Sequence, residues 1–325
     1  MKQSVIVIGG GVAGIAAAVR LAQEGVKVTL IEARNRLGGR ATSFTDATTG
    51  ETLDNCQHVV LRCCTNLLDL YQKLGVADTL QWHRKFYFCD GTGHIDTLQA
   101  DDLPAPFHLT RALWSFGTFS VLEKLAISRA MAALMRVDRT AWHHRSFADW
   151  LTELRQPPTV VEKFWAPVVV SALNELPGRI AADYAMQVFQ EAFFANNTAY
   201  EMGLPGPGIP LVRLYDAAER VITSAGGQVH LNTAAQSLEF DGQNITALNL
   251  TSGEQLTADT YISALTFDRL AKLCDNPIIQ HDPRLQHLRD IRFSPIIGIH
   301  LWFDGVVTDL PHLTLTQSPL QWIFN

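Results

Sequence analysis

The first 32 residues constrain the fold more than any other part of the chain. The apolar run SVIVI at residues 4–8 is typical of a strand buried on both faces of a parallel sheet. GVAGIAAAVRLAQEG follows with helical spacing and ends at Gly25, a residue type common just after helices. A second apolar run, VKVTLIE, ends at Glu32. This order predicts one strand–helix–strand unit of a dinucleotide-binding fold.

The loop GGGVAG within this unit has the spacing that binds a pyrophosphate. Gly9 allows the tight turn out of the strand, Gly11 allows backbone to approach a phosphate, and Gly14 allows close packing of helix on strand. The helix N-terminus then presents free N–H groups to the phosphates. Glu32 is placed to accept hydrogen bonds from ribose hydroxyls and to repel a 2′-phosphate. These residues do not distinguish NAD from FAD, because both contain ADP.

A second glycine-containing loop, EARNRLGGRATS, follows Glu32 directly and separates these two cofactors. A nicotinamide enzyme needs nothing more after the acidic residue, whereas a flavin enzyme must also hold a ribityl chain and a three-ring system. Gly38 and Gly39 permit backbone to pass close to the pyrophosphate and ribityl, and Arg40 can neutralise phosphate charge. Arg34 is expected near the adenosine end. The loop therefore predicts FAD.

The pattern E-x-R-x-R-x-G-G-R resembles the second signature of the FAD-dependent amine oxidase and phytoene desaturase superfamily. The resemblance implies an α/β fold with a Rossmann-like FAD-binding domain of the GR2 type and a discontinuous α+β substrate domain containing a helical insert. It implies that Glu32, Arg34 and Arg40 hold FAD. It implies that the backbone of Val229 contacts the adenine. It also implies that one short loop runs against the flavin ring, formed by Asp54, Asn55, Cys56, Gln57 and His58.

The remaining chain suggests two discontinuous domains. We assign residues 1–80 and 211–266 to the FAD-binding domain, and residues 81–210 and 267–325 to the substrate domain. The middle of the chain, about residues 104–200, is mostly helical in pattern and rich in aromatic residues, which either fill a core or line an apolar tunnel. A three-stranded meander and the buried strand TYISAL follow. SPIIGIHLWFD predicts a further strand, and LQWIFN predicts the start of another.

Four longer motifs narrow the resemblance to the hydroxysqualene dehydroxylase family, also called squalene-associated FAD-dependent desaturases. They are DNCQHVVLRCCTNLLDLYQKLG, SFADWL, FWAPVVVSALNE and EMGLPGPGIPLVRLY. The family removes the hydroxyl of hydroxysqualene to give squalene in bacterial squalene and hopanoid biosynthesis. Two departures stand out. Cys56 occupies a position where the family usually has glycine. Family members also continue past Asn325 with a glycine-containing segment that contacts the flavin, so we expect this chain to be shortened.

The sequence leaves more than one activity open. The resemblance places an amine-oxidase lysine near flavin N5 on a strand like PIIGIHLWF. No lysine follows Lys272, and the matching position is Gly298, which counts against amine oxidation. A phytoene- or carotenoid-type desaturase is a second interpretation, and an inactive shortened fragment is a third. Asp54 and His58 are the candidate general acids because both lie on the flavin-facing loop. The sequence does not indicate an electron donor.

Composition limits the partners and the compartment. Hydrophobic residues make up 47% of the 325 residues and charged residues 18%, and the net charge of -6 is not gathered into runs, so nucleic acid is not expected. Five cysteines without a CxxC pair predict no zinc site and fit a reducing compartment. No apolar run reaches the ~20 residues of a spanning helix. We therefore expect a cytoplasmic enzyme of an apolar isoprenoid, with peripheral contact to the inner face of the cell membrane left open.

One adjacent pair of cysteines has two interpretations. Cys63 and Cys64 lie within residues 58–75, a stretch whose pattern predicts a helix ending at a glycine. Buried small side chains are the preferred interpretation over a redox role.

Overall fold

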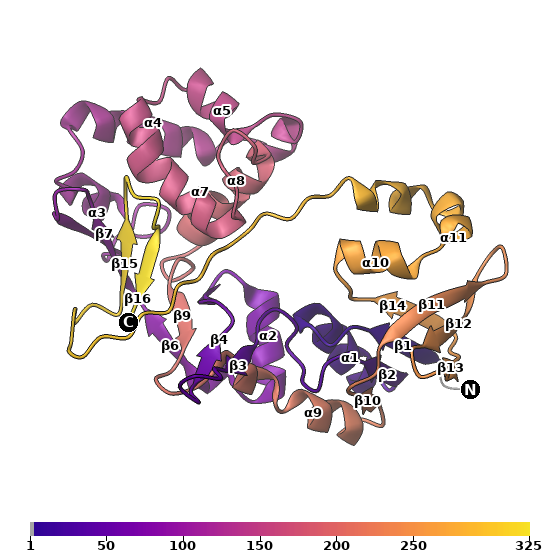
Figure 1. Cartoon of the computed structure of the whole chain (residues 1–325). Helices are drawn as coiled ribbons and strands as arrows, with labels where there is room; N and C mark the ends of the chain where they lie inside the picture. Colours follow the sequence, from indigo (N-terminus) through magenta and orange to yellow (C-terminus); the bar gives the residue numbers. More distant parts are fainter. Residues whose placement is uncertain (1–2) are drawn as a thin grey trace. The chain divides into compact units, whose positions relative to one another are not determined.

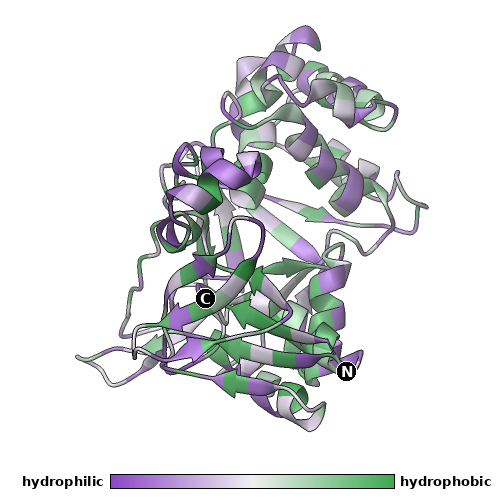
Figure 2. Cartoon of the chain, turned by 90° about the vertical axis from the view of Figure 1, so that its right-hand side faces the viewer, coloured by the Kyte–Doolittle hydropathy of each residue, from purple (hydrophilic) through white to green (hydrophobic). Residues whose placement is uncertain are grey.

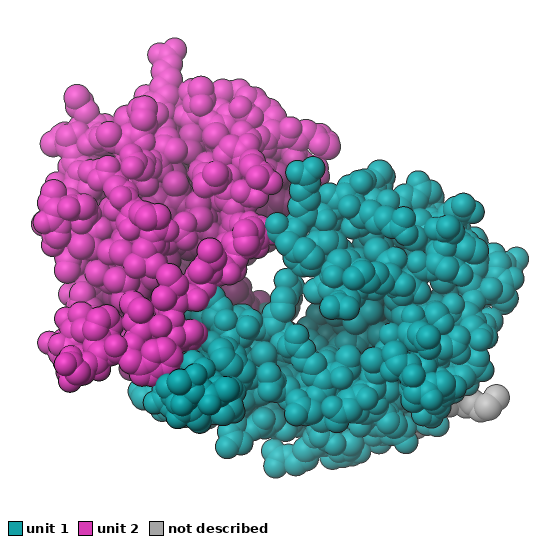
Figure 3. Space-filling view, in the orientation of Figure 1, with its two compact units in different colours: residues 1–58, 66–80, 205–293 teal, residues 59–65, 81–204, 294–325 magenta. Residues whose placement is uncertain are grey.

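The computed structural model describes residues 3–325, which form two compact units (Figure 3). Unit 1 is made of residues up to 58, 66–80 and 205–293, and unit 2 of residues 59–65, 81–204 and 294–325. Each unit therefore combines segments that are distant in the sequence (Figure 1).

Unit 1 is built on a parallel four-stranded sheet. Its strand order is β10 (Gln228–His230), β2 (Lys27–Ile31), β1 (Ser4–Ile8) and β14 (Thr260–Ser263). Helix α1 (Val12–Gln23) connects β1 to β2, and α9 (Ala218–Ser224) precedes β10. Val7 in β1 and Leu30 in β2 are fully buried, and Figure 2 shows hydrophobic residues along the strands. The predicted strand–helix–strand unit and the strand TYISAL are thus confirmed.

Smaller elements complete unit 1. The meander β11 (Ala235–Phe240), β12 (Ile245–Leu250) and β13 (Gln255–Leu256) is present as predicted. The others are β3 (Ser43–Thr45), β4 (Thr52–Asp54), α2 (Thr65–Leu74), η1 (Ala77–Thr79), η5 (Leu211–Tyr215), α10 (Phe267–Leu273), α11 (Asn276–His281) and η6 (Pro283–Arg289). Leu273 of α10 packs in one buried cluster with Ile6, Ile31 and Leu248, so α10 belongs to the core of this unit.

Unit 2 contains two sheets. The larger has the order β16 (Trp322–Phe324), β15 (His312–Leu315), β7 (Lys85–Cys89) and β8 (Ile95–Gln99). The β7–β8 hairpin around DGTG and the strand within LQWIFN are confirmed. β15 pairs in parallel with β7, although more than two hundred residues separate them. The smaller sheet has the order β5 (Val60–Leu61), β9 (Met202–Pro205) and β6 (Leu80–His83).

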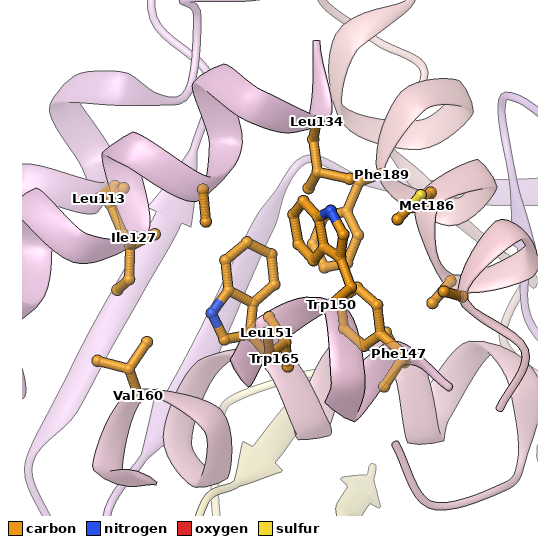
Figure 4. Close-up of a cluster of buried hydrophobic side chains, with 14 of the residues drawn as sticks. Leu113, Ile127, Leu134, Phe147, Trp150, Leu151, Val160, Trp165, Met186 and Phe189 are labelled. Carbon is orange, nitrogen blue, oxygen red and sulfur yellow. The ribbon is translucent and has the colours of Figure 1, made fainter. Parts of the chain in front are cut away.

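The helical part of unit 2 surrounds an aromatic core (Figure 4). Its helices are α3 (Thr110–Ser115), α4 (Val121–Leu134), η2 (Arg139–Trp142), α5 (Phe147–Glu153), α6 (Pro158–Val160), η3 (Val161–Trp165), α7 (Ala166–Leu173), α8 (Ala182–Val188) and η4 (Phe189–Phe194). The ring of Trp165 is buried against those of Phe164 and Phe189, at centroid distances of 4.9 and 5.0 Å. Its indole N–H donates to Gln156 Oε1 at 2.9 Å, so the polar group of the buried ring has a hydrogen-bond partner. These aromatic residues fill a core.

Helix starts within this core follow from local sequence. Ser146 of SFADWL accepts a hydrogen bond from the Asp149 backbone N–H at 3.1 Å, and the Asp149 carboxylate accepts one from the Ser146 N–H at 3.0 Å. Ser120 and Glu123 form the same reciprocal pair at the start of α4. Such capping boxes satisfy N–H groups that the first helical turn leaves without partners.

Two predictions of secondary structure were wrong. The helix predicted for residues 58–75 begins only at Thr65, because residues 60–61 form β5 and pair with β9. SPIIGIHLWFD is not a strand: residues 291–303 have no regular structure, and Ile297 is 85% exposed. The β-branched pattern suits a strand, but a strand needs a hydrogen-bonded neighbour, and within residues 3–325 none pairs with this segment.

The unit boundaries also differ from the predicted domain boundaries. Residues 59–65 lie in unit 2 through β5, whereas residues 205–210 and 267–293 lie in unit 1. The α10 contact with the meander accounts for the last difference. Across the described residues, no helix combines the length and hydrophobicity needed to cross a bilayer.

Candidate cofactor-binding site

The first glycine loop brings β1 and α1 into very close contact. Gly9 has a φ of +105°, which favours glycine, and its N–H donates to Ile31 O at 2.9 Å. A Cβ placed on Gly14 would lie 1.8 Å from Gly9 O, so only glycine fits there. Gly11 is the N-cap of α1 and supplies no side-chain cap, and the first turn has no acidic residue. The N–H groups of that turn are therefore suited to a phosphate.

Glu32 joins this loop to the second one. Its Oε2 accepts a hydrogen bond from the Gly10 N–H at 2.7 Å, and its Oε1 accepts one from the Arg34 N–H at 2.8 Å. The side chain is buried. Because a carboxylate offers about four acceptor positions, both oxygens can still accept from ribose hydroxyls. Glu32 thus holds the protein backbone in addition to its predicted contact with ribose.

Gly10 is a site residue that the glycine spacing did not indicate. A Cβ there would lie 2.6 Å from Leu37 Cδ2 and 2.9 Å from Glu32 Cβ. The available signal was the run of three glycines at residues 9–11, because the G-x-G-x-x-G pattern requires no glycine at its middle position.

The second loop lies directly against the first. The Gly38 N–H donates to Gly10 O at 2.9 Å, and a Cβ on Gly39 would lie 2.9 Å from the Gly11 Cα. Gly38 and Gly39 therefore allow the two loops to pack, which adds to their predicted role beside the pyrophosphate. Arg34 Nη1 donates to Gly39 O at 3.4 Å.

Two cationic side chains of the second loop remain open to a phosphate. Both Arg34 and Arg40 are exposed in unit 1. Arg40 O accepts a hydrogen bond from Asn55 Nδ2 at 3.1 Å, which links this loop to the next segment. Their charge and position fit the anionic part of a dinucleotide.

The predicted flavin-facing segment is held by hydrogen bonds. Asp54 Oδ1 accepts from the Ser43 hydroxyl at 2.7 Å and from the Leu211 N–H at 2.9 Å. These contacts give Asp54 a structural role and do not favour it as a general acid. His58 Nδ1 lies 2.7 Å from Cys56 O, which requires an N–H at Nδ1 and leaves Nε2 for proton exchange.

The other members of this segment are more accessible. Asn55 and Gln57 are exposed, and Cys56 is half-buried. The Asn55 N–H donates to Thr42 O at 2.8 Å, so the start of the segment has a defined position. Their contact with flavin stays a prediction.

Val229 lies on the neighbouring strand. It pairs with Leu30 in the parallel ladder between β10 and β2, and the backbone oxygen of the next residue, His230, accepts the Glu32 N–H at 2.9 Å. Its backbone is therefore close in the sheet to the carboxyl end of β2, where adenine is predicted to bind.

The chain matches the family model described as flavin-containing amine oxidoreductase over residues 12–323. It is 27% identical over 339 aligned residues to a 15-cis-phytoene desaturase of Synechococcus elongatus, covering 98% of this chain and 69% of that protein. It is 26% identical to a zeta-carotene desaturase of Arabidopsis thaliana, covering 98% of this chain and 60% of that protein.

Solved structures show the same fold at lower identity. Putrescine oxidase bound to putrescine has a TM-score of 0.59 and 18% identity, covering 85% of this chain and 61% of that chain. An oxidoreductase from Methanosarcina mazei has a TM-score of 0.63 and 17% identity, covering 84% and 61% respectively. The chain thus spans well under the full length of these relatives.

The fold and the paired glycine loops define a dinucleotide-binding flavoprotein of the oxidoreductase class. The chain belongs to the flavin-containing amine oxidoreductase family, and its cofactor is FAD. The uncapped α1 N-terminus, the buried Glu32 and the exposed Arg34 and Arg40 fit the ADP half of this cofactor.

Proposed function

We propose that this chain forms the FAD-dependent part of an enzyme that acts on a long apolar isoprenoid, most specifically by removing the hydroxyl of hydroxysqualene. The supporting observation is similarity over 98% of the chain to desaturases whose names specify phytoene and zeta-carotene, both long isoprenoids. The motifs DNCQHV and FWAPVVVSALNE support the narrower assignment through their resemblance to hydroxysqualene dehydroxylases.

When bound and reduced, FAD would supply the hydride for the overall conversion of hydroxysqualene to squalene and water. The protein must hold the cofactor, exclude water from the reacting carbon and protonate the departing hydroxyl. Glu32, Arg34 and Arg40 would hold the ADP half.

His58 is the better candidate for the proton donor. Its Nδ1–H is engaged by Cys56 O, so a proton on Nε2 is the one available to a substrate oxygen. Asp54 already accepts two hydrogen bonds through one oxygen.

Desaturation of a phytoene-type polyene is the second candidate. The named desaturases among the relatives favour it. The two reactions run in opposite redox directions, because desaturation takes hydride from the substrate and dehydroxylation delivers it.

The deciding experiment supplies three substrates to the flavin-loaded protein. Reduced protein is given hydroxysqualene without oxygen, and oxidised protein is given phytoene with a quinone acceptor or putrescine with oxygen. Squalene formation is the expected result, and a dehydrogenated phytoene product would favour the second candidate. Hydrogen peroxide from putrescine would contradict both proposals. Absence of turnover by flavin-loaded protein would support the interpretation as an inactive fragment.

A pair of variants tests the proton donor. His58→Gln should lower squalene formation at least tenfold without changing the bound flavin. Asp54→Asn should instead change protein stability more than turnover per bound flavin. The opposite pattern would assign the proton to Asp54.

A further inference from the structure

Residues 62–64 form a short loop in unit 2 in which two cysteines stand side by side. The backbone of this loop is held at each residue. The Arg62 N–H donates to Glu201 O and the Cys63 N–H donates to Ala199 O, both at 3.1 Å, and the Cys64 N–H donates to Leu61 O at 2.9 Å. The loop is therefore fixed between β5 and the residues that precede β9.

The side chain of Arg62 also anchors the loop. Its Nε donates to Glu201 Oε2 at 2.6 Å, and its guanidinium lies 3.8 Å from the centre of the Trp82 ring. Glu201 is only 2% exposed and also pairs with Arg84 Nε at 3.0 Å. The Glu201 carboxylate, which directly precedes β9, is thus paired with two cations, and this weakens its repulsion of a thiolate.

The two thiols of the loop differ in environment. Cys64 is exposed and immediately precedes helix α2, whereas Cys63 is half-buried. The neighbouring Cys63 thiol lowers the pKa of the Cys64 thiol by hydrogen bonding to its charged form. The Cys64 thiol, burial and the nearby Glu191 raise the pKa of Cys63.

This arrangement suits Cys64 to attack an external disulfide and Cys63 to resolve the mixed disulfide that results. An exposed thiolate is the nucleophile in disulfide exchange, and a neighbouring thiol resolves the mixed disulfide. Of the remaining cysteines, Cys56 and Cys89 are half-buried and Cys274 is buried, and none of them is adjacent to another cysteine in the sequence.

We propose that Cys63 and Cys64 form a redox-active dithiol site that exchanges with low-molecular-weight disulfides. The Cys64 thiolate attacks one sulfur of the external disulfide, forms a mixed disulfide and releases the first external thiolate. Cys63 then loses its proton to solvent and attacks the Cys64 sulfur, which releases the second external thiolate. The dithiol is oxidised by two electrons, and the external disulfide is reduced to two thiols.

The disulfide formed between Cys63 and Cys64 should be readily reduced back to two thiols. Adjacent Cα atoms lie about 3.8 Å apart across a trans peptide, below the usual disulfide range of about 4.4–6.8 Å. A disulfide between neighbours is therefore strained, and strained, exposed disulfides are readily reduced. The site is suited to a switch between two redox states and not to a permanent crosslink.

The sequence provides an internal comparison for the test. Trypsin cleavage after Arg62 and Lys73 releases CCTNLLDLYQK, which contains this pair and no other cysteine. Cys56, Cys89 and Cys274 fall in three other peptides. The native protein is treated with an aromatic disulfide that releases a coloured thiolate. Free thiols are then alkylated, and the peptides are weighed.

We expect this peptide to react first, to become two hydrogens lighter and to regain both thiols on reduction. Cys64→Ser should slow thiolate release from this site about tenfold or more, and Cys63→Ser should trap one aromatic thiol on Cys64. A wild-type peptide that retains aromatic thiol adducts, stays unreacted or reacts no faster than the Cys56 and Cys89 peptides would overturn the proposal. Circular dichroism of each serine variant checks that the fold is retained.

Discussion

Alanine substitution at Gly11 and at Gly14 should separate cofactor binding from folding. The two glycines belong to one loop and differ in what an added methyl group would contact. At Gly11 the Cβ would meet only the Gly39 Cα, at 3.9 Å, and the φ of −72° is ordinary for alanine. At Gly14 the Cβ would lie 1.8 Å from Gly9 O.

The magnitudes follow from these distances. Gly14→Ala requires α1 to move from β1 by well over 1 Å, and such overpacking costs about 1–3 kcal/mol. Alanine regains at most about 1 kcal/mol of helix propensity. Gly11→Ala should lower stability by only about 0.5 kcal/mol, through the N-cap position. Its methyl group would instead point into the space of the pyrophosphate, and overpacking of about 1–3 kcal/mol corresponds to a roughly fivefold to 150-fold weaker Kd for FAD.

The assay measures both properties on each variant. Urea unfolding of the flavin-free protein, followed by tryptophan fluorescence, gives stability, and quenching of flavin fluorescence during titration gives Kd. We expect Gly11→Ala to be stable and poor at binding FAD, and Gly14→Ala to be impaired in both. If Gly11→Ala binds FAD as tightly as the unmodified protein, the pyrophosphate does not bind where the loop predicts.

Two further predictions concern unit 2. Arg62→Met should destabilise unit 2 by about 1–2 kcal/mol. The substitution removes a partner that is only 34% exposed and leaves the buried Glu201 carboxylate with one cation. Arg84→Met, at a side chain 68% exposed, should cost less than about 1 kcal/mol in the same urea titration, and equal losses would contradict the argument. Burial and, secondarily, the nearby His83 lower the pKa of His312 to about 4. Its unfolded pKa is about 6.5, so the unfolded state binds more protons between these values and stability falls as pH drops from 6.5 to 4. His312→Leu should flatten this pH dependence of the thermal midpoint, and an unchanged slope would assign the effect to another group.

The parts of the fold that the sequence predicted are those set by local pattern. Strands β1 and β2, the intervening helix and the hairpin at DGTG depend on neighbouring residues and turn chemistry. The pairing of β15 with β7 depends on residues far apart in the chain, and no local pattern selects that partner. The SPIIGIHLWFD segment shows the same limit, since its residues suit a strand and yet it has no neighbour within residues 3–325.

The candidate site divides in the same way. The glycine spacing predicted Gly9, Gly11 and Gly14 because the steric reason for each glycine involves residues close to it in the sequence. The hydrogen bond from Gly10 to Glu32 could not be predicted, because it depends on how closely the two loops approach. The sequence indicates Asp54 as a general acid from its place on the flavin-facing loop, whereas its hydrogen-bond partners Ser43 and Leu211 come from separate segments.

The parallel sheet of unit 1 and the larger sheet of unit 2 each pair strands that are distant in the sequence. This pairing determines the order in which the chain can fold during its synthesis. The helical core of unit 2 comes from one continuous stretch, residues 98–200, and can collapse as soon as that stretch leaves the ribosome. The parallel sheet of unit 1 lacks β14 until Thr260 has been made, and β7 lacks β15 until His312 has been made. The edges of β1 and β7 therefore stay unpaired until β14 and β15 have been made, and this is the period when binding by a chaperone has the most effect on yield.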